Sequence, residues 1–111
     1  MGFHYILDGK KAVECNDIRK WAEWMEEADR RVAYDEINDV QVSTFFLGVF
    51  VNTFTDNRPV LFETMVFGDE DCELNNYSRK YATWNEAEAG HKEVVDMVKE
   101  TMLEQVLIKG L

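Results

Sequence analysis

The sequence predicts a single α+β domain over residues 1–111, in which an antiparallel sheet of about five strands carries two helices packed on one face. Two segments have apolar residues at steps of three and four, which is typical of amphipathic helices. Several shorter segments are rich in β-branched and aromatic residues and are separated by turn residues, which is typical of strands. The predicted element order is ββαβββα.

The first half of the chain predicts a hairpin, a helix and a central strand. Residues 3–7 and 10–14 flank Asp8-Gly9, a pair that favours a tight hairpin turn. Asn16 or Asp17 then caps a helix that extends to about Arg31. Residues 40–54 are apolar or β-branched on both alternating sets, so we expect a strand with a neighbour on each side.

The second half predicts a returning strand, an edge strand and a long helix. Residues 55–59 form a turn and 60–67 pair with the central strand. An acidic loop over 69–76 leads to a short edge strand over 77–82. Thr83 and Glu86 have the spacing of a capping box, which opens a helix running to about Leu107. We expect the core to contain Trp21, Met25, Phe46, Phe62, Val94 and Val98.

The charge of the chain is strongly acidic and unevenly distributed. There are 22 acidic and 12 basic residues, a net charge of −10. Residues 32–76 contain one basic residue, Arg58, and nine acidic ones, a net charge of −8. Such a charge repels phosphate backbones, which disfavours direct nucleic-acid binding. A host protein with a basic surface is therefore the expected partner.

Two acidic clusters and one tryptophan are the candidate partner-binding residues. The clusters precede the central strand and occupy the loop before the edge strand, and a block of carboxylates on a loop sums to a field that steers a basic partner. Trp24 points away from the face of Trp21 and is either an interface anchor or a cover for the sheet edge. The candidates are Trp24, Asp35, Glu36, Asp39, Asp69, Glu70, Asp71 and Glu73.

Motifs of standard enzymes are missing from the sequence, which contains no nucleophile elbow, Walker loop, dinucleotide fingerprint or HExxH. Glu88 and His91 have the Glu-x-x-His spacing of helical metal ligands, and with His4 they form a conceivable zinc cluster. Alternatively, His91 is a core histidine beside Gly90, whose missing side chain lets the helix approach the sheet closely. Two histidines and two unpaired cysteines are few ligands, so we expect neither a metal nor another cofactor.

A cytoplasmic location is expected. Apolar runs fall short of the roughly 18 residues that a membrane span requires, and the N-terminus lacks a signal-peptide pattern. The two cysteines form no CxxC pair, which fits a reducing compartment. The tail over residues 106–111 is apolar for a terminus, so it either packs on its own domain or forms a homodimer contact, and we favour the homodimer contact.

Five segments together cover most of the chain and carry a resemblance: FHYILDG, WAEWMEEADRRV, VSTFFLG, LFETMVFG and YATWNEAEAGH. They closely resemble a family of small, mostly uncharacterised proteins encoded by bacteriophages and by prophage regions of bacterial genomes. The resemblance implies an origin and no chemistry. In the family pattern, Leu-Gly is commonly followed by one residue and then Asp-His, whereas here Gly48 precedes Val49, Phe50 and Val51. Any chemistry of that pair is therefore absent from this chain.

Three functional hypotheses follow. The first is a stoichiometric phage or prophage binding protein, whose acidic middle docks on a basic host surface such as the nucleic-acid channel of a defence or transcription complex. The second is a structural or homo-oligomeric accessory protein, in which the charge serves solubility. The third is a small metal-dependent enzyme built around His4, Glu88 and His91.

Overall fold

A computed structural model describes residues 3–50, 54–55 and 58–110, and it confirms the α+β class. Four strands form an antiparallel sheet in the order β3-β4-β7-β8, on which the long helix α2 packs. Two further strand pairs, β1-β2 and β5-β6, stand outside this sheet. The elements are β1 (Tyr5–Asp8), β2 (Lys11–Glu14), α1 (Ile18–Glu27), β3 (Arg31–Ile37), β4 (Val40–Phe46), β5 (Phe54–Thr55), β6 (Arg58–Pro59), β7 (Phe62–Phe67), β8 (Ser78–Tyr81) and α2 (Trp84–Lys109).

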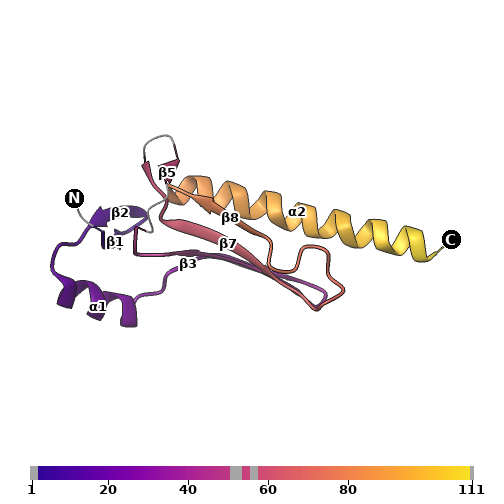
Figure 1. Ribbon diagram of the computed structural model, residues 1–111, viewed down its shortest axis with the longest axis horizontal. Helices are drawn as coiled ribbons and strands as arrows, with labels where there is room; N and C mark the ends of the chain where they lie inside the picture. Colours follow the sequence, from indigo (N-terminus) through magenta and orange to yellow (C-terminus); the bar gives the residue numbers. More distant parts are fainter. Residues whose placement is uncertain (1–2, 51–53, 56–57, 111) are drawn as a thin grey trace.

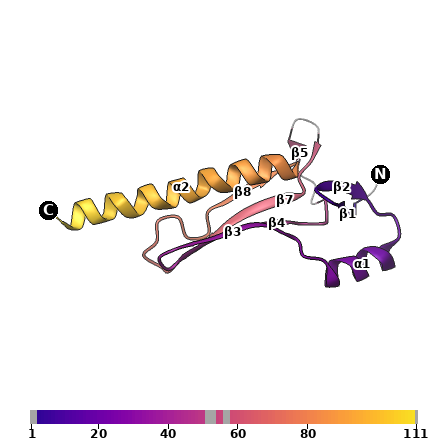
Figure 2. The ribbon, with the colours of Figure 1, turned by 180° about the vertical axis from the view of Figure 1, so that it is seen from behind.

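The molecule is elongated, with principal extents of 59 × 30 × 23 Å. α2 runs along the sheet and extends past the tip of the β3-β4 hairpin, so the C-terminus lies at one end of the longest axis (Figure 1). The β1-β2 hairpin and α1 lie at the other end, as the reverse view also shows (Figure 2). We call these the distal end and the proximal end.

The proximal hairpin forms as predicted, with its turn shifted by one residue. Asp8 pairs with Lys11, so Gly9 and Lys10 make the turn. Gly9 has a φ of 61°, a left-handed conformation that glycine adopts without steric cost. Glycine at the first central position is the signature of one of the two favoured hairpin turns.

Helix α1 is shorter than predicted. Asp17 caps it, since its carboxylate accepts hydrogen bonds from the backbone N–H groups of Arg19 and Lys20. The helix ends at Glu27 instead of Arg31, because Ala28 is already extended with a ψ of 145°. Trp21 and Met25, predicted in the core, are half-buried, so that part of the core prediction is wrong. α1 contacts β1 at the proximal end instead of lying deep in the interior.

Strand β3 was not predicted, and the strand predicted over residues 40–54 is shorter in the structure. β3 pairs antiparallel with β4, which ends at Phe46. Residues 51–53 lie outside the described part of the chain, and β5 follows them. A two-residue connection, Asn38-Asp39, joins β3 to β4, and Asn38 takes up a left-handed φ of 53°. Asparagine tolerates this conformation, so Asn38-Asp39 is the sequence feature that favours a turn between the two strands.

The core lies between α2 and the inward face of the sheet, in two clusters. A valine cluster toward the distal end contains Val40, Val42, Val66, Val94, Val95 and Val98. An aromatic cluster toward the proximal end contains Phe46, Leu61, Phe62, Tyr81 and Ala87, with Tyr5, Trp24 and Trp84 packed against it. The predicted core positions Phe46, Phe62, Val94 and Val98 are confirmed, and all four are buried.

Gly90 lets α2 approach the sheet closely, as the sequence predicts. A Cβ atom built at this position would lie 2.2–2.4 Å from atoms of the Tyr81 side chain. Those distances are far below van der Waals contact, so the Tyr81 ring occupies the space that any larger residue at position 90 requires. The glycine therefore determines how near the helix lies to β8.

Candidate functional site

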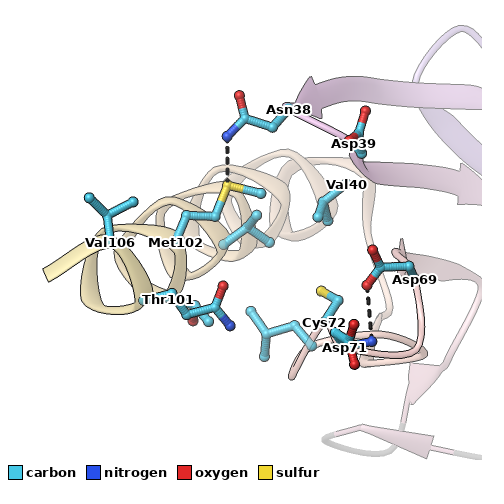
Figure 3. Close-up of a pocket in the computed structure, with 12 residues that line it drawn as sticks. Asn38, Asp39, Val40, Asp69, Asp71, Cys72, Thr101, Met102 and Val106 are labelled. Carbon is cyan, nitrogen blue, oxygen red and sulfur yellow. Dashed lines mark hydrogen bonds between the residues drawn. The ribbon is translucent and has the colours of Figure 1, made fainter. Parts of the chain in front are cut away.

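The strongest candidate site is a pocket of about 340 Å³ at the distal end, which we call the acidic groove (Figure 3). Three carboxylates from two separate loops line it. Asp39 comes from the β3-β4 turn, and Asp69 and Asp71 come from the loop between β7 and β8. The helix α2 forms the opposite wall. The other lining residues are Asn38, Val40, Cys72, Leu74, Val98, Thr101, Met102, Gln105 and Val106.

The β3-β4 turn is held against α2. The Asn38 side-chain amide lies 3.4 Å from the Met102 sulfur, to which it donates (Figure 3). Val40, the first residue of β4, is buried in the valine cluster. Both chain neighbours of Asp39 are therefore held in place, which fixes the position of its backbone at the edge of the groove.

The acidic loop is fixed by its own hydrogen bonds. The Asp69 carboxylate accepts a bond of 3.0 Å from the Asp71 N–H, and the Cys72 N–H donates to the Asp69 carbonyl. The Asn75 side chain accepts from the Gly68 N–H at 3.0 Å. Cys72 packs on the valine cluster. Asp69 and Asp71 therefore project from a turn-rich loop with defined geometry.

The groove combines negative charge with an apolar wall. Met102 and Val106 line it from the helix, and Leu74 lines it from the loop. Lysine and arginine side chains match this arrangement, because their methylene stems pack on apolar surface while the charged head reaches a carboxylate. A basic side chain with an apolar stem is therefore chemically complementary to this groove.

Apolar surface continues from the groove along the end of α2. The side chains of Leu103, Val106, Leu107 and Ile108 are 65–71% exposed, and Val106 also lines the groove. Val106 and Leu107 follow Leu103 by three and four residues, so the three side chains lie on one side of the helix. Contiguous exposed apolar residues of this kind are typical of protein interaction sites.

The remaining predicted partner-binding residues lie outside the groove. Glu70 and Glu73 are exposed on the acidic loop, and Glu36 is exposed on β3. Trp24 lies at the proximal end, where its ring packs edge-on against Phe46 with centroids 5.7 Å apart. The structure thus brings together Asp39, Asp69 and Asp71, three of the eight candidates.

Asp35, the eighth candidate, begins a chain of polar contacts that sequence reasoning missed. Its carboxylate lies 2.8 Å from His91 Nε2. The chain continues from His91 Nδ1 to the Thr44 hydroxyl at 2.6 Å, to the Thr64 hydroxyl at 2.5 Å and to the Tyr81 hydroxyl at 3.0 Å. Thr44 and Thr64 are inward-facing threonines on two neighbouring strands, and this was the signal in the sequence.

Thr44, Thr64 and His91 form a buried polar belt between the two hydrophobic clusters, and the Asp35 side chain at its end is exposed. His91 is 3% exposed, and Thr44 and Thr64 are fully buried. Burial raises the pKa of Tyr81, so its hydroxyl stays neutral over the physiological range. An aspartate, a histidine and a threonine in sequence resemble a nucleophilic triad, but a fully buried hydroxyl cannot attack a bound molecule. The belt is structural.

The two histidines do not share a site. His4 packs edge-on against the Trp21 ring, with centroids 4.6 Å apart, while His91 bonds to Asp35 and Thr44. Within residues 3–50, 54–55 and 58–110, no three histidine, cysteine or acidic side chains gather closely enough to hold a metal. The cluster of His4, Glu88 and His91 on which the enzyme hypothesis depends is therefore not formed by the described residues.

The start of α2 carries a carboxylate whose pKa is lowered. The hydrogen bond from the Thr83 hydroxyl lowers the pKa of Glu86, and Arg58 lowers it further through two bonds of 3.0 and 3.2 Å. The Thr83 hydroxyl also accepts from the Glu86 N–H, as the predicted cap requires. A hydrogen bond from the Thr83 backbone also lowers the pKa of Glu86, as the predicted capping box requires, and the carboxylate bonds in addition to the Thr83 hydroxyl and to Arg58.

Comparison with known proteins gives no relative from which a function could be inferred. No protein family, curated protein or solved structure matches this chain. In the described part of the chain, neither helix has the length together with the apolar character that a membrane crossing demands.

Proposed function

We propose that this chain is a phage- or prophage-type accessory protein of the host cytoplasm that acts by stoichiometric binding, with the acidic groove as its docking site. Its partner is a host protein with a basic surface, such as the nucleic-acid channel of a defence complex of the CRISPR or restriction type. By accepting basic side chains from the rim of that channel, the acidic groove holds the chain over the channel and inhibits the complex. The resemblance of five sequence segments to phage-encoded proteins supports the origin.

The observation that carries this proposal is the convergence of Asp39, Asp69 and Asp71 on one pocket with an apolar wall. Carboxylates scattered over a surface serve solubility, but three carboxylates held around one hollow present a directional site. Complementary charge accelerates the encounter and selects the partner, while the apolar wall lowers the rate of dissociation.

Charge neutralisation tests the proposal. The variant Asp39→Asn, Asp69→Asn, Asp71→Asn removes three charges and keeps a side-chain oxygen that accepts from the residue 71 N–H. We expect it to capture the basic host protein at least about tenfold more weakly and with a flatter salt dependence. Quantitative pull-down from host lysate at low and high salt, followed by mass spectrometry, measures this.

A matched control removes three charges elsewhere. Glu23, Glu26 and Glu27 are exposed on α1, and their replacement by glutamine leaves the groove unchanged. We expect this control to bind like the unmodified chain. If the groove variant and the control capture the partner equally at both salt concentrations, binding does not depend on the groove charges. The apolar end of α2 or Trp24 then becomes the contact.

A homo-oligomeric accessory protein is the second candidate, and the exposed apolar side of α2 favours it. Leu103, Val106, Leu107 and Ile108 are apolar and more than half exposed, which is the pattern expected when a second copy covers a helix end. Sedimentation velocity of the unmodified chain separates the two candidates. A monomer throughout the micromolar range contradicts the homo-oligomer.

A further inference from the structure

The proximal end contains a second pocket, of about 570 Å³, between the β1-β2 hairpin and the start of α2. We call it the basic pocket. Its volume lies in the range of roughly 300–1,000 Å³ typical of small-molecule sites. Its lining residues are Tyr5, Asp8, Lys10, Lys11, Ala12, Arg58, Pro59, Leu61, Phe62, Ala82, Thr83, Trp84 and Asn85.

The charge of this pocket is opposite to that of the chain. Among the described residues that line it, Asp8 is the single carboxylate, whereas Lys10, Lys11 and Arg58 are cationic. The Arg58 charge is balanced by its paired bonds to Glu86. Lys10 and Lys11 are exposed and form no ion pair within the part of the chain that the structure describes. Two lysine charges are thus available in a protein whose net charge is −10.

The first turn of α2 adds donors to the same wall. Thr83, Trp84 and Asn85 line the pocket, and the N–H groups of Trp84 and Asn85 have no partner within the helix. Such groups and the helix dipole favour an anion. The Glu86 N–H is capped by the Thr83 hydroxyl, and the Glu86 carboxylate in the same turn is balanced by Arg58. Together with the two lysines, the N–H groups of Trp84 and Asn85 give the pocket a set of donors that suits a phosphate.

Aromatic surface lies next to these cations. The Lys10 ammonium is 5.9 Å from the centroid of the Trp84 ring, and Tyr5 lines the pocket from β1. The Trp84 Nε1 atom is buried with no hydrogen-bond partner among the described residues, so the ring contributes to the pocket through its face. Indole rings stack on nucleobases of every kind.

From these observations we propose that the basic pocket binds a small aromatic phosphate of the mononucleotide class. Its phosphate contacts Lys10, Lys11 and the first turn of α2, and its base stacks on Trp84. In a mononucleotide, a single sugar lies between the base and the phosphate. This short spacing matches the 5.9 Å between the Lys10 ammonium and the centroid of the Trp84 ring. Polymeric nucleic acid is disfavoured, because residues 32–76 repel the phosphates beyond the pocket.

Calorimetric titration of the full chain with adenosine monophosphate tests the inference, with tryptophan fluorescence as a second readout. We expect saturable one-to-one binding, with weaker binding of adenosine and of inorganic phosphate because each supplies half of the contacts. The variant Lys10→Gln, Lys11→Gln is expected to bind at least about tenfold more weakly. Trp84→Phe, which keeps a smaller ring for stacking, is expected to lose a smaller factor.

A matched control is available on α1. Arg19 and Lys20 are adjacent and exposed, so Arg19→Gln, Lys20→Gln removes the same two charges away from the pocket. This control is expected to bind like the unmodified chain, and thermal melting verifies that every variant is folded. Absence of binding at millimolar nucleotide, or equal binding by the lysine variant and the control, overturns the proposal. Inorganic phosphate binding as tightly as the nucleotide, or preferential binding of a single-stranded oligonucleotide, also overturns it.

Discussion

The two halves of the interface between α2 and the sheet are built from different side chains and carry different surfaces. The distal half buries six valines, and the acidic groove lies over it. The proximal half buries phenylalanine and tyrosine rings, and the basic pocket lies over it. The polar belt of Thr44, Thr64 and His91 separates the two halves.

This difference follows from what each half must hold together. The valine cluster joins a helix to a sheet, two regular surfaces that small β-branched side chains fill well. The aromatic cluster also anchors the β1-β2 hairpin through Tyr5 and Leu7, and α1 through Trp24. Large rings reach across irregular gaps that valine cannot span, and they bury more area for each residue. Loss of one ring therefore disturbs several elements.

The largest expected effect tests this difference directly. Phe62 is fully buried and contacts the rings of Phe46 and Trp84, so Phe62→Ala is expected to lower the free energy of unfolding by about 3–5 kcal/mol. Val94→Ala in the valine cluster is expected to cost about 2 kcal/mol. Urea denaturation measures both values. Amide exchange distinguishes them further, because only Phe62→Ala is expected to reduce protection in the β1-β2 hairpin. Equal losses with no change in the hairpin contradict the comparison.

A smaller effect is expected at the boundary between the halves. Thr44→Val keeps the shape of the side chain but leaves His91 Nδ1 and the Thr64 hydroxyl short of a partner. We expect a loss of about 1–3 kcal/mol. Thr64→Val removes the same threonine pair, so the double variant is expected to cost less than the sum of the two single variants. Strict additivity in urea denaturation indicates that the belt does not act as one network.

The smallest effect concerns pH at the proximal end. Because the folded pKa of Glu86 is lowered, its stabilising contribution is present above the ordinary glutamate value and is lost as the pH falls through the lowered one. Glu86 and Arg58 are about two-fifths exposed, so solvent screening reduces the contribution to roughly 0.5 kcal/mol. Glu86→Gln is expected to flatten the decline in urea midpoint below about pH 4.5. Glu23→Gln on α1 is the control, and an equal flattening in both variants contradicts the assignment.

Local patterns in the sequence determined much of the secondary structure. The Asp17 and Thr83 caps, the hairpin at Gly9, the strand ending at Phe67 and the buried face of α2 all follow from residues close together in the chain. The regional acidity of residues 32–76 is also a property of the sequence alone. Such features depend on hydrogen bonds and periodicities that extend over a few residues, so they can be predicted without coordinates.

Tertiary structure decided where these elements end and which side chains meet. Strand β3 is an edge strand that contains the polar residues Asp35 and Glu36. Its hydrogen bonds to β4 make it a strand, although its own sequence pattern does not predict one. Asp39 and Asp69 line one pocket only because α2 and two loops enclose the same hollow. His91 was expected in the core, but its bond to Asp35 joins residues 56 positions apart. Contacts at that separation depend on the packing of the whole domain, which local propensity does not encode.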